Sequence, residues 1–180
     1  MSALCKPFGV TLAFAFLVCS LAAEQPIRIP VGPRRPASPP DLLRSSGYIF
    51  AGTVKSVERV TPKQHDSVGV MRITFQVEKG IRGVQSTQML VIQEWMGLWE
   101  AGERYRPGER ALLFLYPPSK LGLTSLVGGP MGRFAIGEGD GILLDNARTG
   151  RLSPEIQSGL EGKKRISVEE FARVLQMGRE

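Results

Sequence analysis

The sequence predicts a mainly β domain of small-barrel type, with a short helix before the first strand and a helix near the C-terminal end. Three observations support this fold class. Apolar and polar residues alternate strictly over 71–78, an unbroken apolar run covers 111–116, and apolar residues recur at helical spacing over 168–175. About five short strands, separated by turns rich in glycine and proline and without an internal repeat, indicate a small barrel.

The first elements follow a proline pair at 39–40. Residues 41–44 are predicted to form a helical turn, and the β-rich stretch 48–60 a long strand. Gly52 lies in the middle of this strand, where a missing side chain marks a bulge or a bend. The alternation over 71–78 then predicts a second strand with one buried and one solvent-facing side. Its predicted buried residues are Met71, Ile73, Phe75 and Val77.

The middle of the chain supplies two more strands. Residues 88–95 are predicted to form the third strand, and 97–108 a long loop. This loop ends in a tight turn at 107–110, where proline and glycine are adjacent. The apolar run 111–116 that follows is typical of a strand covered on both faces.

Further strand is predicted at 123–126 and at 132–136. Residues 137–141 are rich in glycine and contain two acidic side chains. They lack the regular spacing of oxygen ligands that a calcium loop requires, so we expect a hairpin turn there. Residues 146–165 are predicted to be a long loop that brings the last element back onto the barrel.

The last predicted element is a helix over 167–177. Ser167 and Glu170 have the spacing of a capping box and predict its start. Four apolar residues at positions i, i+3, i+4 and i+7 form one face: Val168, Phe171, Ala172 and Leu175. Because such a face must be covered, we expect it to pack against the barrel.

Residues 1–23 have the features of a cleavable secretory signal. Lys6 precedes an apolar run over 10–21, and small residues end that run. The run is too short to cross a bilayer, which takes roughly 20 residues, so we expect no membrane span in the mature protein. The predicted location is therefore secreted or periplasmic, with lipidation at Cys19 as the less favoured alternative.

Cysteine and proline positions divide the rest of the chain. Cys5 and Cys19 are the only cysteines, so a mature protein without the signal forms no disulfide. Residues 24–40 contain six prolines and are predicted to be an extended tether. Residues 41–180 are predicted to be a single domain that is stabilised by burial alone, and we expect a monomer.

The charge pattern does not indicate a nucleic-acid partner. The formal net charge is +6, and the basic residues are spread along the chain. The largest basic clusters are 34–35, in the proline-rich segment, and 163–165, before the last helix. A nucleic-acid surface would concentrate lysine, arginine and aromatic residues on one element.

Candidate catalytic and metal-binding residues are few. His65 is the only histidine and lies in a polar loop, so we expect neither a metal site nor a cofactor. No nucleophile elbow, zinc-protease motif or phosphate loop is present, and we predict no catalytic residue. Paired carboxylates near the 97–108 loop are the one catalytic alternative, and they would make the protein a hydrolase. They are Glu94, Glu100, Glu103 and Glu109.

Aromatic residues are the strongest functional signal. Trp95 and Trp99 bracket three residues, and Tyr105 follows them closely. Large aromatic side chains near a loop are typical of protein interfaces and of glycan-binding faces, so these three residues are the predicted binding site. The alternative, that the tryptophans fill one end of the barrel, is equally consistent with the sequence.

Three motifs occur in a recognisable order at 48–54, 73–83 and 107–114. Over about 45–116 the chain resembles bacterial exported proteins similar to the netrin-like domain of tissue inhibitors of metalloproteinases. The resemblance implies a five-stranded OB-type barrel with a helix packed against it. The inhibitors bind the target's zinc through an N-terminal cysteine, which a mature form of this chain lacks, so no inhibitory residue is carried over.

The leading functional hypothesis is a non-catalytic exported module that binds a protein or glycan of the cell envelope. A metalloprotease inhibitor that works without the zinc-binding cysteine is the second hypothesis, and the carboxylate hydrolase is the third.

Overall fold

The computed structural model describes residues 41–60, 69–100, 102 and 104–177, and all of them belong to one compact unit that spans 38–180. The predicted signal, the predicted tether and His65 lie outside the described residues. Among the described helices, none is long and apolar enough to cross a membrane.

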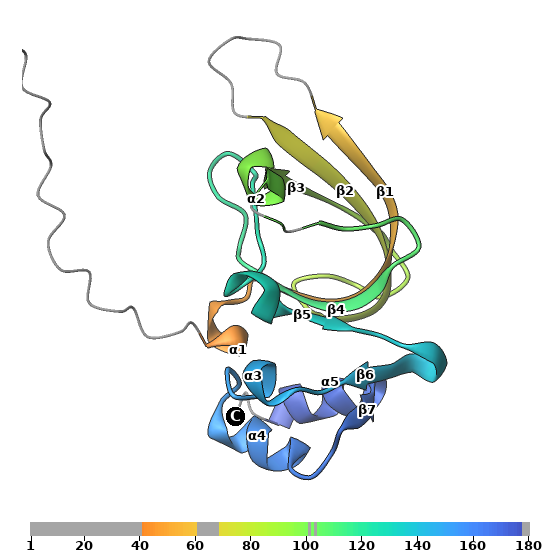
Figure 1. Cartoon of the computed structure of the whole chain (residues 1–180), viewed down its shortest axis with the longest axis vertical. Coiled ribbons are helices and arrows are strands. Elements are labelled where there is room, and N and C mark those ends of the chain that lie inside the picture. The colour runs from red at the N-terminus through yellow and green to blue at the C-terminus, as the bar shows by residue number, and fades with distance from the viewer. Residues whose placement is uncertain (1–40, 61–68, 101, 103, 178–180) are drawn as a thin grey trace, which may run out of the picture. The chain divides into compact units, whose positions relative to one another are not determined.

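A five-stranded antiparallel sheet forms the centre of this unit (Figure 1). Its spatial order is β3-β2-β1-β4-β5, so β3 and β5 are the edge strands. The helical turn α1, Leu42–Ser45, precedes the sheet, as predicted. The strands are β1 (Tyr48–Val60), β2 (Val70–Arg82), β3 (Met89–Trp95), β4 (Arg110–Leu115) and β5 (Arg133–Ala135).

The predicted irregularity at Gly52 is confirmed. The pairing of β1 with β2 changes register between Ala51 and Gly52. A Cβ atom at Gly52 would stand 2.6 Å from the backbone oxygen of Gln76, which is too close for any side chain. Glycine therefore lets the two long strands approach each other where they bend (Figure 1).

The sheet is not closed, so the predicted barrel is not confirmed. Residues 123–126, predicted to be strand, form only isolated bridges, from Leu123 to Gln93 of β3 and from Leu126 to Leu115 of β4. Leu123 bridges β3 in parallel and Leu126 bridges β4 in antiparallel, so the segment crosses between two strands and does not run alongside either of them. The segment thus reaches from β4 to the free edge of β3 without becoming a strand of the sheet.

Both faces of β4 are buried, as its apolar run predicted. Leu112 and Phe114 lie in one hydrophobic cluster, and Leu113 and Leu115 lie in the other. All residues of β4 from 111 to 115 are buried. Successive side chains of β4 point to opposite faces, so the strand contributes residues to two separate hydrophobic clusters.

The predicted alternation of β2 is confirmed. Its four apolar residues, Met71, Ile73, Phe75 and Val77, are buried in the second cluster, while the side chains between them are at least partly exposed. The second cluster also contains Phe50 and Tyr105.

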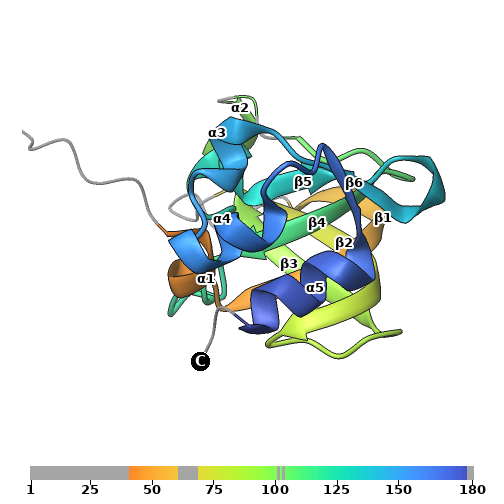
Figure 2. The ribbon, with the colours of Figure 1, turned by 90° about the horizontal axis from the view of Figure 1, so that it is seen from below.

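A second layer, formed by the C-terminal part of the chain, covers the other face (Figure 2). The prediction of a loop over 146–165 is wrong, because this stretch contains two short helices and the start of a strand. Asp145 caps the first helix through the backbone of Arg148, and Pro154 opens the second. These elements are α3 (Asn146–Thr149), α4 (Pro154–Leu160) and β7 (Arg165–Ser167), with β7 pairing to β6 (Gly141–Leu143).

The predicted hairpin turn at 137–141 is confirmed. It connects β5 to β6 and contains the 3-10 turn η2, Glu138–Asp140. Another 3-10 turn, η1 (Gly129–Gly132), precedes β5. The amide of Gly137 donates to the carbonyl of Gly141 at 2.9 Å, which closes the turn.

The predicted C-terminal helix is confirmed as α5, Val168–Met177. The Ser167 hydroxyl accepts from the amide of Glu170 at 3.2 Å, so one half of the capping box is present. The predicted apolar face is buried, and the ring of Phe171 lies 5.5 Å from that of Phe134 in β5. Figure 2 shows α4 and α5 side by side over the strands.

Candidate functional site

Edge strand β3 carries a row of exposed apolar side chains. Met89, Val91 and Trp95 are each about half exposed, at 53%, 52% and 51%. Their positions differ by two and by four residues, so their side chains project from the same face of the strand. We call these three residues the β3 row.

The indole of Trp95 is held against the backbone that follows β3. A Cβ atom at Gly97 would stand 2.5 Å from Cη2 of Trp95, so the glycine makes room for the ring. The amide of Met96 also donates to the carbonyl of Gly69 at 2.9 Å, which anchors the chain next to the ring. Trp95 is therefore exposed to solvent on one side and supported on the other.

The loop predicted over 97–108 begins instead with the short helix α2 (Met96–Glu100). The loop prediction is wrong for 97–100, because a helix of five residues carries too little periodicity to stand out in the sequence. The helical turn changes the direction of the chain, so Trp99 lies back against the second hydrophobic cluster.

Trp99 and Tyr105 meet at one buried carboxylate. Trp99 Nε1 donates to Glu94 Oε2 at 3.2 Å, and the Tyr105 hydroxyl donates to Glu94 Oε1 at 3.1 Å. Glu94 is fully buried and Tyr105 is 3% exposed. The Tyr105 ring also packs edge-on against Phe75, with centroids 5.5 Å apart. These contacts fix the chain from α2 to β4 on the inner side of the sheet.

The three predicted binding residues are thus divided between two faces. Neighbouring residues of a strand point to opposite sides, so Trp95 and Glu94 face away from each other. Trp99 and Tyr105 lie on the same side of the sheet as Glu94, where they pack against the second hydrophobic cluster. Trp95 fits the hypothesis of an interface residue. Trp99 and Tyr105 fit the alternative, in which aromatic side chains fill the interior at one end of the sheet.

Two of the four predicted carboxylates have described side chains, and both are engaged by other groups. Glu94 binds Trp99 and Tyr105, and Glu109 forms an ion pair with Arg133. Glu103 and the side chain of Glu100 lie outside the described part of the chain. Across the residues that are described, no group of three or more histidine, cysteine, aspartate or glutamate residues could hold a metal ion.

An ion-pair network centred on Arg110 joins β4, β2 and η2 and has a structural role. Arg110 Nη2 lies 2.6 Å from Glu78 of β2 and 2.6 Å from Asp140 of η2. The hydrogen bond from Arg110 holds the pKa of the Glu78 carboxyl below its usual value, and a hydrogen bond from Thr53 acts in the same direction. Arg110 therefore links two sheet strands to the β5–β6 turn.

Sequence reasoning missed a group of four arginines near Tyr105. They are Arg104, Arg106, Arg133 and Arg148, and they line two adjoining cavities. They come from three segments of the chain, so no local run of basic residues could reveal the group.

The fold and the described side chains define a mainly β protein with a five-stranded antiparallel sheet and a helical layer. No protein-family model matches the chain, and no characterised protein or solved structure shows significant similarity to it.

Proposed function

We propose that this protein is an exported, non-catalytic module that binds a protein of the cell envelope through the β3 row. The observation that carries the proposal is the exposure of three large apolar side chains on one face of an edge strand. Contiguous exposed apolar surface is uncommon on soluble monomers and marks interaction sites.

The chemistry of the β3 row favours a protein ligand over a glycan. Met89 and Val91 offer aliphatic contact area without hydrogen-bonding groups, whereas glycan recognition needs polar groups beside the aromatic ring. Polar residues also share this face: Gln93 lies between Val91 and Trp95, and Arg72, Thr74 and Gln76 of β2 pair with Gln93, Val91 and Met89. The preference for a protein ligand therefore rests on the aliphatic part of the row. Tryptophan is the residue type most often found at energetic centres of protein interfaces.

The support of Trp95 by Gly97 strengthens this proposal. A side chain that is already held in place loses less conformational freedom when a partner binds. The ring is accessible while the strand below it is anchored, which is the arrangement a preformed contact site requires.

The exported location and the OB-type barrel belong to the same proposal. The predicted signal over 1–23 supports export. The bridges of 123–126 to β3 and β4 partly span the opening of the sheet, which supports a barrel-like OB architecture. We also propose a relationship to netrin-like exported proteins, and this part of the proposal is based on the motifs within 48–114.

The test is capture of envelope proteins by the purified 24–180 protein, with crosslinking and with a Trp95→Ala variant. We expect Trp95→Ala to weaken the recovered interaction by about 2 kcal/mol or more, as for interface hot spots. Leu121→Ala is the matched control, because Leu121 is 74% exposed and lies outside the β3 row.

Leu121→Ala should keep the melting temperature of the wild type, whereas Trp95→Ala loses the packing of the indole against Gly97 and should melt slightly lower. Equal capture by the wild type and by Trp95→Ala would contradict the proposal. Competition by soluble envelope glycans, with no protein recovered, would show that the ligand is a glycan.

A further inference from the structure

The four arginines form a groove beside β5. One cavity of about 470 Å³ is lined by Gly102, Arg104, Arg106, Glu109 and Arg133. A second cavity of about 240 Å³ shares Gly102, Arg104 and Arg133 with the first and extends to Arg148. We call the combined space the arginine groove.

Carboxylates neutralise only part of this groove. Glu109 pairs with Arg133 and also accepts from the backbone amide of Arg106, so both of its oxygens are engaged. Asp145 accepts from the backbone amide and the Nη1 of Arg148. Within the described part of the chain, no carboxylate pairs with the side chain of Arg104 or Arg106.

Arg133 is held rigidly at the centre of the groove. Its guanidinium lies over the Tyr105 ring, 5.1 Å from the centroid, and its Nη1 donates to the carbonyl of Arg104 at 2.8 Å. Burial lowers the pKa of Arg133, and the nearby charges of Arg106 and Arg148 lower it further, against the opposing effects of Tyr105 and Glu94. Positive groups therefore repel one another here, and a bound anion would relieve that repulsion.

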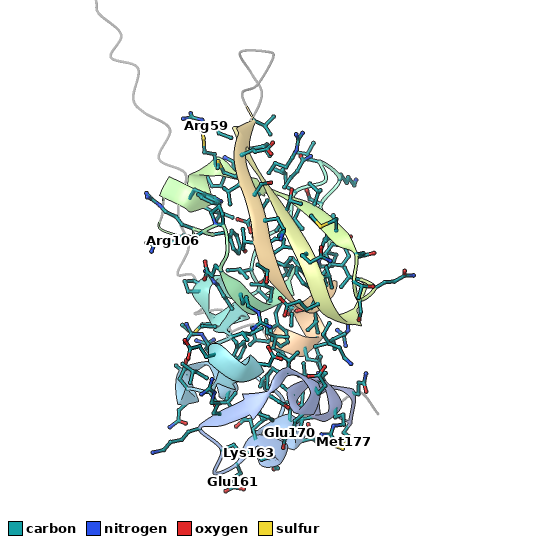
Figure 3. All side chains as sticks on the ribbon, turned by 90° about the vertical axis from the view of Figure 1, so that its right-hand side faces the viewer. Arg59, Arg106, Glu161, Lys163, Glu170 and Met177 are labelled. Atoms are coloured by element: carbon teal, nitrogen blue, oxygen red, sulfur yellow. The ribbon has the colours of Figure 1, made fainter. Side chains whose placement is uncertain are left out.

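Arg104 and Arg106 supply the accessible donors. Both side chains are exposed, and Arg104 Nε donates a long hydrogen bond of 3.4 Å to the Trp99 carbonyl. Figure 3 shows Arg106 projecting outward from the sheet half of the molecule. Arg148 lines the second cavity, and its Nε–H is buried and has no acceptor among the described residues.

We propose that the arginine groove binds an oxyanion ligand that carries two or more negative charges, as carboxylates or as phosphate. Guanidinium groups bind both kinds of oxyanion through paired, charge-assisted hydrogen bonds. The ordered Arg133 positions the ligand, while Arg104 and Arg106 close on it from the rim. This site goes beyond the proposed function, because no residue of the β3 row takes part in it.

The test is calorimetric titration of the purified 24–180 protein with citrate and, separately, with inorganic pyrophosphate. We expect binding of at least one anion, with an affinity that falls as the salt concentration rises. Binding of citrate alone identifies a carboxylate ligand, and binding of pyrophosphate alone identifies a phosphate ligand. The double variant Arg104→Gln, Arg106→Gln should weaken binding by about tenfold or more.

The matched control removes two positive charges elsewhere, with Lys164→Gln and Arg173→Gln. Both residues are exposed in the C-terminal layer, away from the cavities that form the groove. This control should bind as the wild type does. Equal weakening in the two double variants would overturn the proposal, because net charge alone would then explain it.

Absence of binding by either anion would also overturn the proposal. Arg148→Gln is a second, independent test of the site, and this variant should also bind the anion more weakly. Trp95→Ala should keep full anion binding, so failure of the groove and failure of the β3 row are distinguishable.

Discussion

The two faces of the sheet are covered by different means. A layer of helices and the β6–β7 pair covers one face over β1, β4 and β5, and the cluster there contains apolar side chains such as Phe134 and Phe171. The other face is closed at one end by the chain from α2 to Tyr105, around the buried Glu94. The first cluster is apolar throughout, whereas the second contains a buried carboxylate with two hydrogen-bonded aromatic side chains at its end.

The largest expected effect is on the helical face. A protein that ends at residue 165 loses α5 and exposes the apolar surfaces on both sides of the contact with it. At about 1.5–3 kcal/mol for each large buried side chain, the loss takes most of the 5–15 kcal/mol that stabilises a domain. We expect the 24–165 protein to be unfolded or aggregated in circular dichroism and light scattering. A melting curve that overlays that of the 24–180 protein would show that α5 is not part of the stable core.

A smaller effect is expected at the buried carboxylate of the other face. Glu94→Ala leaves Trp99 Nε1 and the Tyr105 hydroxyl without their acceptor, which costs about 1–3 kcal/mol for each buried donor that stays unsatisfied. Glu94→Gln should cost less, because its amide oxygen still accepts one of these bonds.

Urea unfolding of the two variants measures this difference. Tyr105→Phe is the matched control, since it removes one donor and keeps the ring. If Glu94→Ala unfolded at the same urea concentration as the wild type, the polar contacts would not hold this end of the sheet together.

Gly97→Ala tests whether support of Trp95 matters to binding more than to folding. The new Cβ would displace the indole, from which it would stand 2.5 Å. Because the ring is half exposed, we expect a stability loss of about 1 kcal/mol or less, with weaker capture of the envelope partner.

Tryptophan fluorescence in a Trp99→Phe background reports the movement of Trp95 directly. Gly102→Ala is an informative comparison, because a Cβ there meets no atom within 4 Å, although its φ of +111° adds backbone strain. An unchanged emission spectrum in Gly97→Ala would contradict the supporting role of this glycine.

The smallest effect concerns the pH dependence of the Glu78–Arg110 pair. Arg110 holds the folded pKa of Glu78 below the usual 4.5, so the pair stabilises the folded state above that pH. This contribution is lost as the pH falls through the folded pKa. The pair is partly exposed, so we expect about 1 kcal/mol or less.

Urea unfolding at several pH values checks this expectation. The stability difference between the wild type and Glu78→Gln should shrink between about pH 5 and pH 3. Glu58→Gln is the control, because its pair with Arg72 is exposed and spans 3.9 Å. A constant difference across this range would show that Glu78 does not contribute through its charge.

Local patterns in the sequence determined the elements whose periodicity or end signals lie within a few residues. The alternation of β2, the apolar run of β4 and the face of α5 are patterns of this kind, and the structure confirms them. The irregularity at Gly52 could be predicted for the same reason, since a glycine within a strong strand pattern marks a bend.

Tertiary structure alone decided the arrangement of the site. Strand periodicity places Glu94 and Trp95 on opposite faces, but only the fold brings Trp99 and Tyr105 to the buried carboxylate. The arginine groove likewise joins segments that are far apart in the chain. The short helices α3 and α4 were missed because helices of one or two turns carry weak periodicity and depend on tertiary contacts for their stability. Local spacing can therefore predict which residues face a core, whereas long-range contacts decide which of them meet.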